Sequence, residues 1–307
     1  MLVTNKELLE EASKGKYGVG AFNINNMEFV QAITEAAAEL NSPAIIAVSE
    51  GAIKYAGFEN LVAMVNIAAK GDNTRFSLHL DHGKDMDVIE RCIENGFTSV
   101  MIDGSHLPYE ENVAVTREVV KKAGSRGISV EGELGQLAGV EDNVSVSEQD
   151  AKFTDPDEAA RFVESTGVGS LAVAVGTSHG AYKFKGEPRL GMDRLSDIAS
   201  KVSVPLVLHG ASGVNREHVE IANRFGADIG DARGVPDDAI KEAVKRGISK
   251  VNIDTDMRIA FTAFIRKKFS LDPDIFDPRK YLGAGRDAIA EVVKTKIRLF
   301  GSENKIG

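Results

Sequence analysis

A chain of 307 residues is long enough for two small domains or for one large α/β barrel. Its net charge of -9 argues against nucleic acid as the main partner, but not against a small anionic substrate held in a local positive pocket. Its single cysteine excludes an intramolecular disulfide. The sequence has no signal-peptide core in residues 1–10 and no apolar run near the roughly 18 residues of a membrane span, so we expect a cytoplasmic protein that does not bind membranes.

Eight short apolar segments alternate with helical patterns along the chain. A first helix, capped by Thr4 or Asn5, should end near Gly15, just before the first strand. Strands spaced by helices in this way pair in parallel through right-handed crossovers. We expect strands at 19–24, 44–48, 76–83, 99–102, 128–134, 171–175, 205–208 and 250–253. We expect helices at 26–40, 61–69, 87–95, 109–123, from 155 onward, and at 192–200, 217–225, 237–246, 258–269 and 288–300.

Eight such units are what a (β/α)₈ barrel needs, so we predict an α/β protein with a TIM barrel and extra N- and C-terminal helices. A doubly wound open sheet is the alternative. The barrel is favoured because polar clusters follow nearly every strand, at the end where barrels carry their chemistry. No linker divides the chain, so we expect one domain over 1–307. Two long stretches without a period, about 135–154 and 176–190, are expected to be mobile loops.

Three of the six histidines follow predicted strands. His82 ends the third strand, His179 lies after the sixth, and His209 ends the seventh. Singly, each is more often a structural histidine, but three ligands on one rim with an open fourth position match a catalytic zinc site. Asp81 precedes His82, so on an extended backbone the two side chains point to opposite sides, and one can bind metal while the other acts on substrate. We expect His79 behind the metal ligands, His106 in a loop and His218 on a solvated helix face.

Two glutamates share one face of the predicted fifth strand. Glu131 and Glu133 are two residues apart, and side chains in a strand alternate with that period. Two inward carboxylates are costly unless a cation or hydrogen bonds hold them. A nearby metal would supply that cation.

Small or polar loops follow the sixth, seventh and eighth strands, at 176–180, 210–213 and 252–255. Barrel phosphate sites commonly use backbone N–H groups of the last loops. Lys183 can add a point charge. Glycine in a loop is weak evidence on its own, because tight turns need it anyway.

Several motifs, in this order and over essentially the whole length, resemble those of the class II, metal-dependent fructose-bisphosphate aldolases, closest to the shorter class IIB branch. They are HLDHG at 79–83, EGELG at 131–135 continuing to GVE at 139–141, GTSHG at 176–180 and NIDTD at 252–256.

The resemblance implies reversible cleavage of fructose 1,6-bisphosphate to dihydroxyacetone phosphate and glyceraldehyde 3-phosphate. Zinc would act as a Lewis acid that stabilises the enediolate, and a monovalent cation, Na⁺ or K⁺, would lie near the phosphate. The partner would be a small sugar bisphosphate, and the assembly a homodimer or homotetramer. A tagatose-1,6-bisphosphate aldolase is the close alternative. A non-catalytic sugar-phosphate-binding barrel is the alternative from another class, and a binding module has no need of acid/base groups.

The resemblance also implies a role for individual residues. Zinc ligands are His82, His179 and His209, with Glu133 as an alternate ligand. Acid/base and enediolate residues are Asp81 for the aldehyde half, Glu141 as the proton-abstracting base, with Glu148 as the other candidate, and Asn252 at the enediolate. Phosphate-binding residues are Gly180, Lys183, Gly210, Ser212, Asp254 and Thr255 at the ketose phosphate, and Ser49 and Arg279 at the second phosphate, the arginine reaching in from a neighbouring subunit.

Two features depart from the family pattern. Ala138 stands where a second glycine is usual, which should slightly stiffen the loop. Residues 215–233 indicate an insertion of about one helix. This helix would contribute either to subunit contacts or to the active-site rim.

Overall fold

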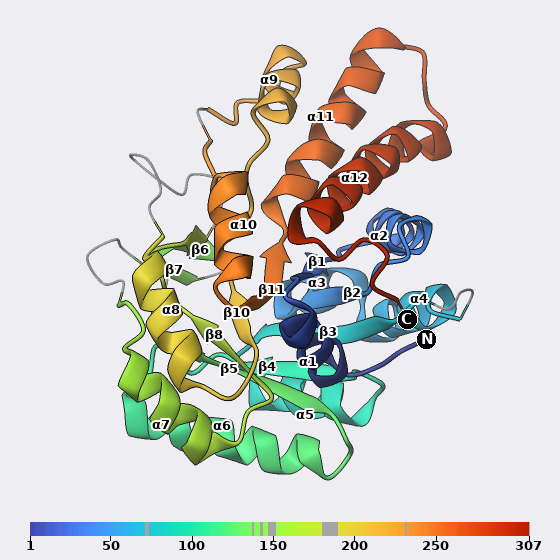
Figure 1. The fold of residues 1–307 in the computed structure, drawn as a ribbon. Coiled ribbons are helices and arrows are strands. Elements are labelled where there is room, and N and C mark those ends of the chain that lie inside the picture. Colours follow the sequence, from blue (N-terminus) through green and yellow to red (C-terminus); the bar gives the residue numbers. More distant parts are fainter. Residues whose placement is uncertain are drawn as a thin grey trace.

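The structure is a computed structural model that describes residues 1–70, 74–136, 138–141, 144–146, 152–179, 190–230 and 232–306, with the backbone alone at 138–141, 144–146 and 179. Within that part of the chain, parallel strands close a barrel in the order β1-β11-β10-β8-β5-β4-β3-β2 (Figure 1). The predicted TIM barrel is therefore confirmed, and the open sheet is wrong, because β1 pairs with both β2 and β11. The barrel strands are β1 (Val19–Asn23), β2 (Ala44–Ser49), β3 (Phe76–Gly83), β4 (Ser99–Ile102), β5 (Ser129–Leu134), β8 (Ser170–Val173), β10 (Leu206–Leu208) and β11 (Ile248–Ile253).

Helices surround the barrel in the order that the sequence predicts, with one addition. A short helix follows β2 directly, where only a polar strand end was expected. It begins because Ser49 caps it: the Ser49 Oγ accepts a hydrogen bond from the Ala52 N–H at 3.2 Å. The helices are α1 (Asn5–Gly15), α2 (Met27–Glu39), α3 (Glu50–Ala56), α4 (Phe58–Ala68), α5 (Met86–Glu94), α6 (Tyr109–Gly124), α7 (Pro156–Thr166), α8 (Met192–Lys201), α9 (Arg216–Arg224), α10 (Asp237–Lys245), α11 (Thr255–Leu271) and α12 (Pro278–Phe300).

Helix α1 closes the amino-terminal end of the barrel. Thr4 and Glu7 form a capping box at its start, with Thr4 Oγ1 accepting from the Glu7 N–H at 3.2 Å. Leu8 and Leu9 are fully buried against the first residues of the barrel strands, including Val19. This end of the barrel is therefore packed with apolar side chains, which leaves the carboxyl end for polar groups.

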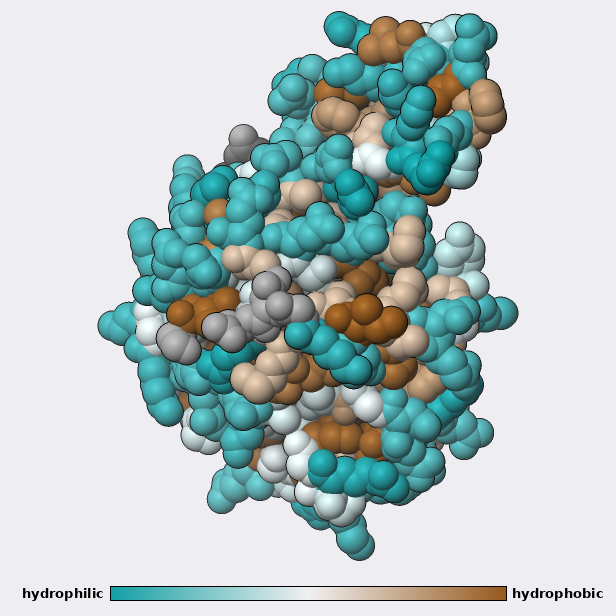
Figure 2. Space-filling view, turned by 90° about the vertical axis from the view of Figure 1, so that its right-hand side faces the viewer, coloured by the Kyte–Doolittle hydropathy of each residue, from teal (hydrophilic) through white to brown (hydrophobic). Residues whose placement is uncertain are grey.

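Helices α11 and α12 form an antiparallel arm that stands out from the barrel, with α9 packed on α11 (Figure 1). The turn between them lies at the far end of the arm. Large apolar side chains are exposed near that turn: Leu271 is 67% exposed and Phe276 is 90% exposed. The arm forms the lobe at the top of Figure 2, where brown side chains reach the surface.

The two long stretches that interrupt the alternation are not independent loops. Parts of them form a small sheet in the order β7-β6-β9, from β6 (Ala138–Glu141), β7 (Val144–Val146) and β9 (Ser178–His179). The sequence did not predict these strands, because strands of two to four residues are too short to show a period. The predicted mobility concerns residues that lie in large part outside the described ranges.

No helix among the described residues combines the length and the apolar character that crossing a membrane requires.

Candidate functional site

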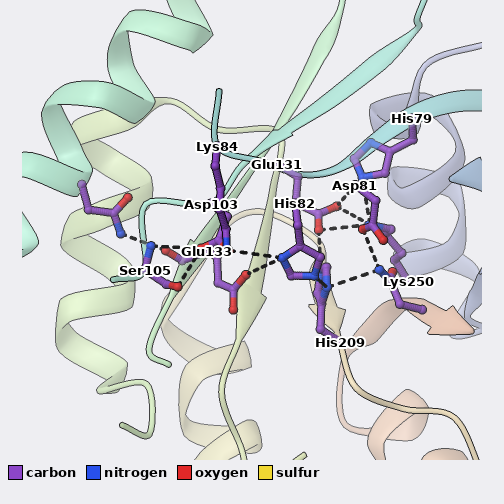
Figure 3. Close-up of polar contacts among 12 residues, drawn as sticks. His79, Asp81, His82, Lys84, Asp103, Ser105, Glu131, Glu133, His209 and Lys250 are labelled. Atoms are coloured by element: carbon purple, nitrogen blue, oxygen red, sulfur yellow. Dashed lines mark hydrogen bonds and ion pairs between the residues drawn. The ribbon is translucent and has the colours of Figure 1, made fainter. Parts of the chain in front are cut away.

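Polar side chains from four strands converge inside the carboxyl half of the barrel (Figure 3). β3 carries Asp81 and His82 just before its last residue. β5 carries Glu131 and Glu133, and β11 carries Lys250 and Asn252, while His209 follows β10. The two predicted glutamates and two of the three predicted histidines are thus brought together.

The centre of the site is a pair of imidazoles. His82 Nε2 and His209 Nδ1 lie 2.7 Å apart. His82 has a positive φ of 47°, which is uncommon for a residue other than glycine, and the β3–β4 register is irregular between Leu80 and Gly83. Such a local irregularity turns a side chain away from the direction that the strand would give it. The backbone at the end of β3 thereby aims His82 at His209.

Carboxylates stand behind both imidazoles. His209 Nε2 is 2.8 Å from Glu131 Oε1, and His82 Nδ1 is 3.4 Å from Asp103 Oδ2 and 3.6 Å from Glu133 Oε2. In Figure 3, His82 lies between Glu133 on one side and His209 on the other. Each ring therefore offers one nitrogen to the common centre and the other to a carboxylate. This is how metal-ligating histidines are oriented in proteins.

Two groups of side chains have the spacing of a metal site, and they share His82. One comprises Asp81, His82 and His209, and the other His82, Asp103 and Glu133; within each, one ligand atom per residue lies within 4.8 Å of the others. Imidazole nitrogens and carboxylate oxygens are suitable ligands for zinc. The donor set among the described residues thus fits the zinc predicted from the sequence.

Asp81 is almost completely buried and is held as a carboxylate. Its two oxygens accept hydrogen bonds from the side-chain amides of Asn23 and Asn252, each at 2.8 Å. Burial would raise the pKa of Asp81, but the nearby charges of His82 and Lys250 hold it below its ordinary value. In this state Asp81 can accept a proton from a substrate hydroxyl.

The sequence reasoning missed Lys250, which lies fully buried beneath the imidazoles. Its ammonium donates to Glu131 Oε2 at 2.8 Å, to Glu131 Oε1 at 3.0 Å and to His79 Nε2 at 3.1 Å. The cation that the two glutamates were expected to need is, for Glu131, the ammonium of a lysine rather than a metal. The available signal was a lysine two residues before Asn252 in a predicted strand, hence on the same face.

His79 lies where it was expected, behind the metal-site histidines. Its Nε2 lies 3.1 Å from the Lys250 Nζ, and its Nδ1 lies 2.9 Å from the Ser99 Oγ. Burial and then the Lys250 ammonium lower the pKa of His79 to about 3. Asn5 of α1 also reaches His79, with 3.2 Å between Nδ2 and Nδ1. The buried polar groups thus extend from α1, at the amino-terminal end of the barrel, to the imidazoles of His82 and His209.

The predicted phosphate loops after β10 and β11 lie next to each other. The Asp254 N–H donates to the Ser212 Oγ at 3.3 Å, and Thr255 begins α11. Gly210 has a φ of 61°, a left-handed conformation that favours glycine, and a Cβ there would be 2.6 Å from the Ser178 carbonyl oxygen. These loops bring backbone N–H groups and a helix N-terminus to one edge of the site, as a phosphate requires.

The remaining predicted residues differ in their positions. Ser49 ends β2 opposite Asp81 and caps α3. Arg279 lies exposed on the arm, paired with Asp277 at 2.8 Å. His218 is half-buried against Phe264 rather than solvated, because α9 packs on α11. His106 is exposed in a loop, as expected. Outside the described residues lie Gly180, Lys183, Glu148 and the side chains of His179 and Glu141.

The sequence pattern of the family described as Fructose-bisphosphate aldolase class-II matches residues 3–305. The chain belongs to the class II fructose-bisphosphate aldolases. Curated relatives named fructose-bisphosphate aldolase include that of Thermus caldophilus, 52% identical over 98% of this chain and 99% of that protein, and that of Helicobacter pylori strain J99, 48% identical over the full length of both. Class II aldolases are zinc-dependent aldehyde-lyases, and the histidine–carboxylate cluster of this aldolase fits that chemistry.

Solved structures agree with the class II aldolase fold. The YdjI aldolase from Escherichia coli K12 superposes with a TM-score of 0.82 at 33% identity and covers all of both chains. A putative fructose-1,6-bisphosphate aldolase from Coccidioides immitis gives a TM-score of 0.81 at 30% identity, covering 98% of this chain and 97% of that chain.

The insertion predicted at 215–233 stays a prediction. The segment contains α9, which packs on α11 of the arm. The insertion was predicted because the sequence pattern of the family resumes only at Gly234, after one helix.

Proposed function

We propose that this class II aldolase cleaves fructose 1,6-bisphosphate reversibly to dihydroxyacetone phosphate and glyceraldehyde 3-phosphate at the His82–His209 pair. The observation that carries the proposal is this pair of facing imidazoles, each with a carboxylate on its outer nitrogen. His82, His209 and His179 would hold zinc, with Glu133 as an alternate ligand. Zinc bound there would supply a Lewis acid for the ketose carbonyl.

Asp81 is proposed to take the proton from the substrate hydroxyl during cleavage and to return it to the aldehyde oxygen during condensation. The buried, hydrogen-bonded carboxylate is the form that cleavage needs. Asn252 is proposed to stabilise the enediolate. Because the Asn252 amide already donates to Asp81, Asn252 would connect the group that acts on the aldehyde oxygen with the group that stabilises the enediolate.

Glu141 is proposed as the base that abstracts the proton beside the ketose carbonyl, with Glu148 as the other candidate. Glu141 ends β6, and β6 pairs in parallel with β9, the strand that carries His179. The backbone of the proposed base is thus tied to that of a proposed zinc ligand. Closure of 135–154 over bound substrate would exclude water.

The ketose phosphate is proposed to bind between the loops after β10 and β11. The hydrogen bond between Ser212 and Asp254 and the start of α11 at Thr255 support this placement. Gly210, Gly180 and Lys183 would complete the site, with a monovalent cation, Na⁺ or K⁺, nearby. Ser49 would contact the second phosphate, together with Arg279 of a neighbouring subunit.

The assembly is proposed to be a homodimer or homotetramer of the class IIB type, with one barrel domain per chain. Exposed apolar side chains on the arm, Leu271 and Phe276, support a subunit contact there. The exposed position of Arg279 on the same arm is consistent with a role in a second subunit.

Metal removal and substrate comparison test the proposed reaction. Chelation should abolish cleavage of fructose 1,6-bisphosphate, and zinc should restore it. Borohydride in the presence of substrate should trap no adduct on Lys183 or Lys250. Full activity of the metal-free protein would refute the zinc mechanism. Faster turnover of tagatose 1,6-bisphosphate than of its fructose epimer would change the substrate but keep the reaction.

Asp81 lies close enough to His82 and His209 to share a metal ion with them, and it is also the proposed acid/base group. One variant separates the two roles. Asp81→Ala should lower kcat by about 10²-fold or more, as the loss of general acid/base catalysis does. Zinc content, measured by mass spectrometry, should stay unchanged. A loss of zinc in Asp81→Ala would instead assign Asp81 to the metal.

Two further variants test the base. Glu141→Ala should bind dihydroxyacetone phosphate with near-normal affinity, yet no longer exchange its carbon-bound hydrogen with solvent. Glu148→Ala should have a smaller effect on exchange. The opposite pattern would make Glu148 the base.

A further inference from the structure

A buried carboxylate anchors the loop that follows β10. Asp256, in the first turn of α11, is 2% exposed. Its Oδ2 accepts a hydrogen bond from the Gly213 N–H at 2.9 Å. Together with the bond from Asp254 to Ser212, this contact joins the two proposed phosphate loops at two neighbouring positions.

A lysine from the arm neutralises that carboxylate. Lys296 of α12 is 7% exposed, and its Nζ lies 3.3 Å from Asp256 Oδ2 and 3.2 Å from Asp237 Oδ1. Burial would lower the pKa of Lys296, but Asp256 and Asp237 together raise it above its ordinary value. A Cβ added to Gly213 would be 3.0 Å from the Lys296 Nζ. The ammonium therefore lies directly against the loop backbone.

The loop is held in a strained conformation. Val214 has a φ of 53°, which is rare for a β-branched residue. The Ser212 carbonyl accepts a hydrogen bond from the Val235 N–H at 3.1 Å, and a Cβ on Gly234 would be 2.2 Å from that carbonyl oxygen. Strain of this kind persists only where surrounding contacts determine the conformation. Asp256 and Val235 provide such contacts.

We propose that Asp256 and Lys296 are positioning residues for the ketose phosphate: Asp256 fixes the loop at Gly213, and Lys296 cancels the charge of Asp256. The inference rests on the proposed function, in which Ser212 and Gly210 bind that phosphate. A buried carboxylate beside the loop would by itself repel a phosphate dianion, because charges in a poorly solvated site are weakly screened. The arm thus supplies the countercharge that allows a carboxylate to support an anion site.

The test measures binding of dihydroxyacetone phosphate to the zinc-loaded full chain by calorimetry. Lys296→Met should raise its Kd by about tenfold or more, since it leaves an uncompensated carboxylate under the loop. The double variant Lys296→Met with Asp256→Asn should recover most of the affinity, because the amide keeps an acceptor for Gly213 and removes the charge. In turnover, Lys296→Met should raise KM more than it lowers kcat, because the ground state and the transition state share the phosphate contact.

Lys294→Met is the matched control. Lys294 lies two residues away on α12 and also pairs with two carboxylates, Glu39 at 2.6 Å and Glu291 at 3.2 Å. Its loss should leave the Kd of dihydroxyacetone phosphate unchanged, because these carboxylates lie on α2 and α12.

Several outcomes would overturn the inference. One is a folded Lys296→Met protein with the wild-type Kd, and another is a double variant that binds as weakly as Lys296→Met. If Lys296→Met does not fold, the single variant Asp256→Asn decides. It should bind dihydroxyacetone phosphate no more weakly than the wild type does. Tenfold weaker binding would contradict the inference. Ser212→Ala separates this result from the proposed function, because an unchanged Kd in that variant would show that the loop does not bind the phosphate.

Discussion

Glu131 connects the metal-site imidazole of His209 to the buried ammonium of Lys250. Through this contact the ring of His209 is held in one orientation and one tautomer. We expect Glu131→Gln to weaken zinc binding by about tenfold to a hundredfold, the usual effect of losing a carboxylate behind a histidine ligand. Competition with a chromogenic chelator would measure the affinity.

Glu118→Gln provides the control for that experiment. Glu118 pairs with Lys122 at 2.9 Å on the surface of α6, far from the imidazoles in the fold, so zinc affinity should not change. A folded Glu131→Gln protein with wild-type zinc affinity would show that Glu131 contributes to the stability of the barrel alone.

His79 makes folding stability depend on pH. Its pKa of about 3 in the folded state is below its unfolded value of 6.5, so the unfolded chain binds more protons between these values. Its stabilising contribution is therefore present above pH 6.5 and is lost as pH falls toward 3, by up to about 1.4 kcal/mol per pH unit. Urea unfolding of zinc-free protein at pH 7 and pH 5 should show a smaller pH effect in His79→Gln than in the wild type. Equal pH effects in the two proteins would mean that His79 is protonated inside the fold.

At the level of elements, α1 should affect stability without affecting turnover. Thr4→Ala removes the side-chain acceptor of its capping box and should lower the free energy of unfolding by about 1 kcal/mol. The kcat should stay at the wild-type value, because α1 lies at the end of the barrel opposite the imidazoles. Ser200→Ala, which removes only a bond to the Asp197 carbonyl near the end of α8, is the control for loss of a helix hydroxyl. Denaturant melts and steady-state kinetics on both variants would decide the point.

The alternating pattern of the sequence was sufficient to predict the barrel strands, because each is a run of buried residues between helices of clear period. The sheet of β6, β7 and β9 could not be predicted, since its strands are very short and β6 pairs with β9 across 40 residues of chain. The same limit applied to the site. Metal-ligand candidates follow strands and were visible, whereas Lys250 and Glu131 are 119 residues apart and reveal their pairing only in the folded barrel.

For the whole molecule, the proposed placement of Arg279 across a subunit interface predicts complementation. Arg279→Ala and Asp81→Ala should each be nearly inactive alone. Mixed and reassembled subunits should regain part of the activity, because some sites in a mixed oligomer have an intact Asp81 and receive Arg279 from the other subunit. Coupled assays before and after reversible dissociation would measure this recovery. Absence of recovery in oligomers shown to be mixed would place Arg279 in its own subunit's site or outside catalysis.

The pairing of β6 with β9 also limits how this chain can change in length. Surface connections usually tolerate inserted or deleted residues. Here Gly139 is opposite His179 in a parallel ladder, while Gln136 already bridges Lys152. Deleting one residue between Gln136 and Gly139 would shift the β6–β9 ladder by one position. Changes of length should therefore be tolerated poorly between β5 and β6, and a library of single-residue deletions scored for turnover would show where the permitted positions begin.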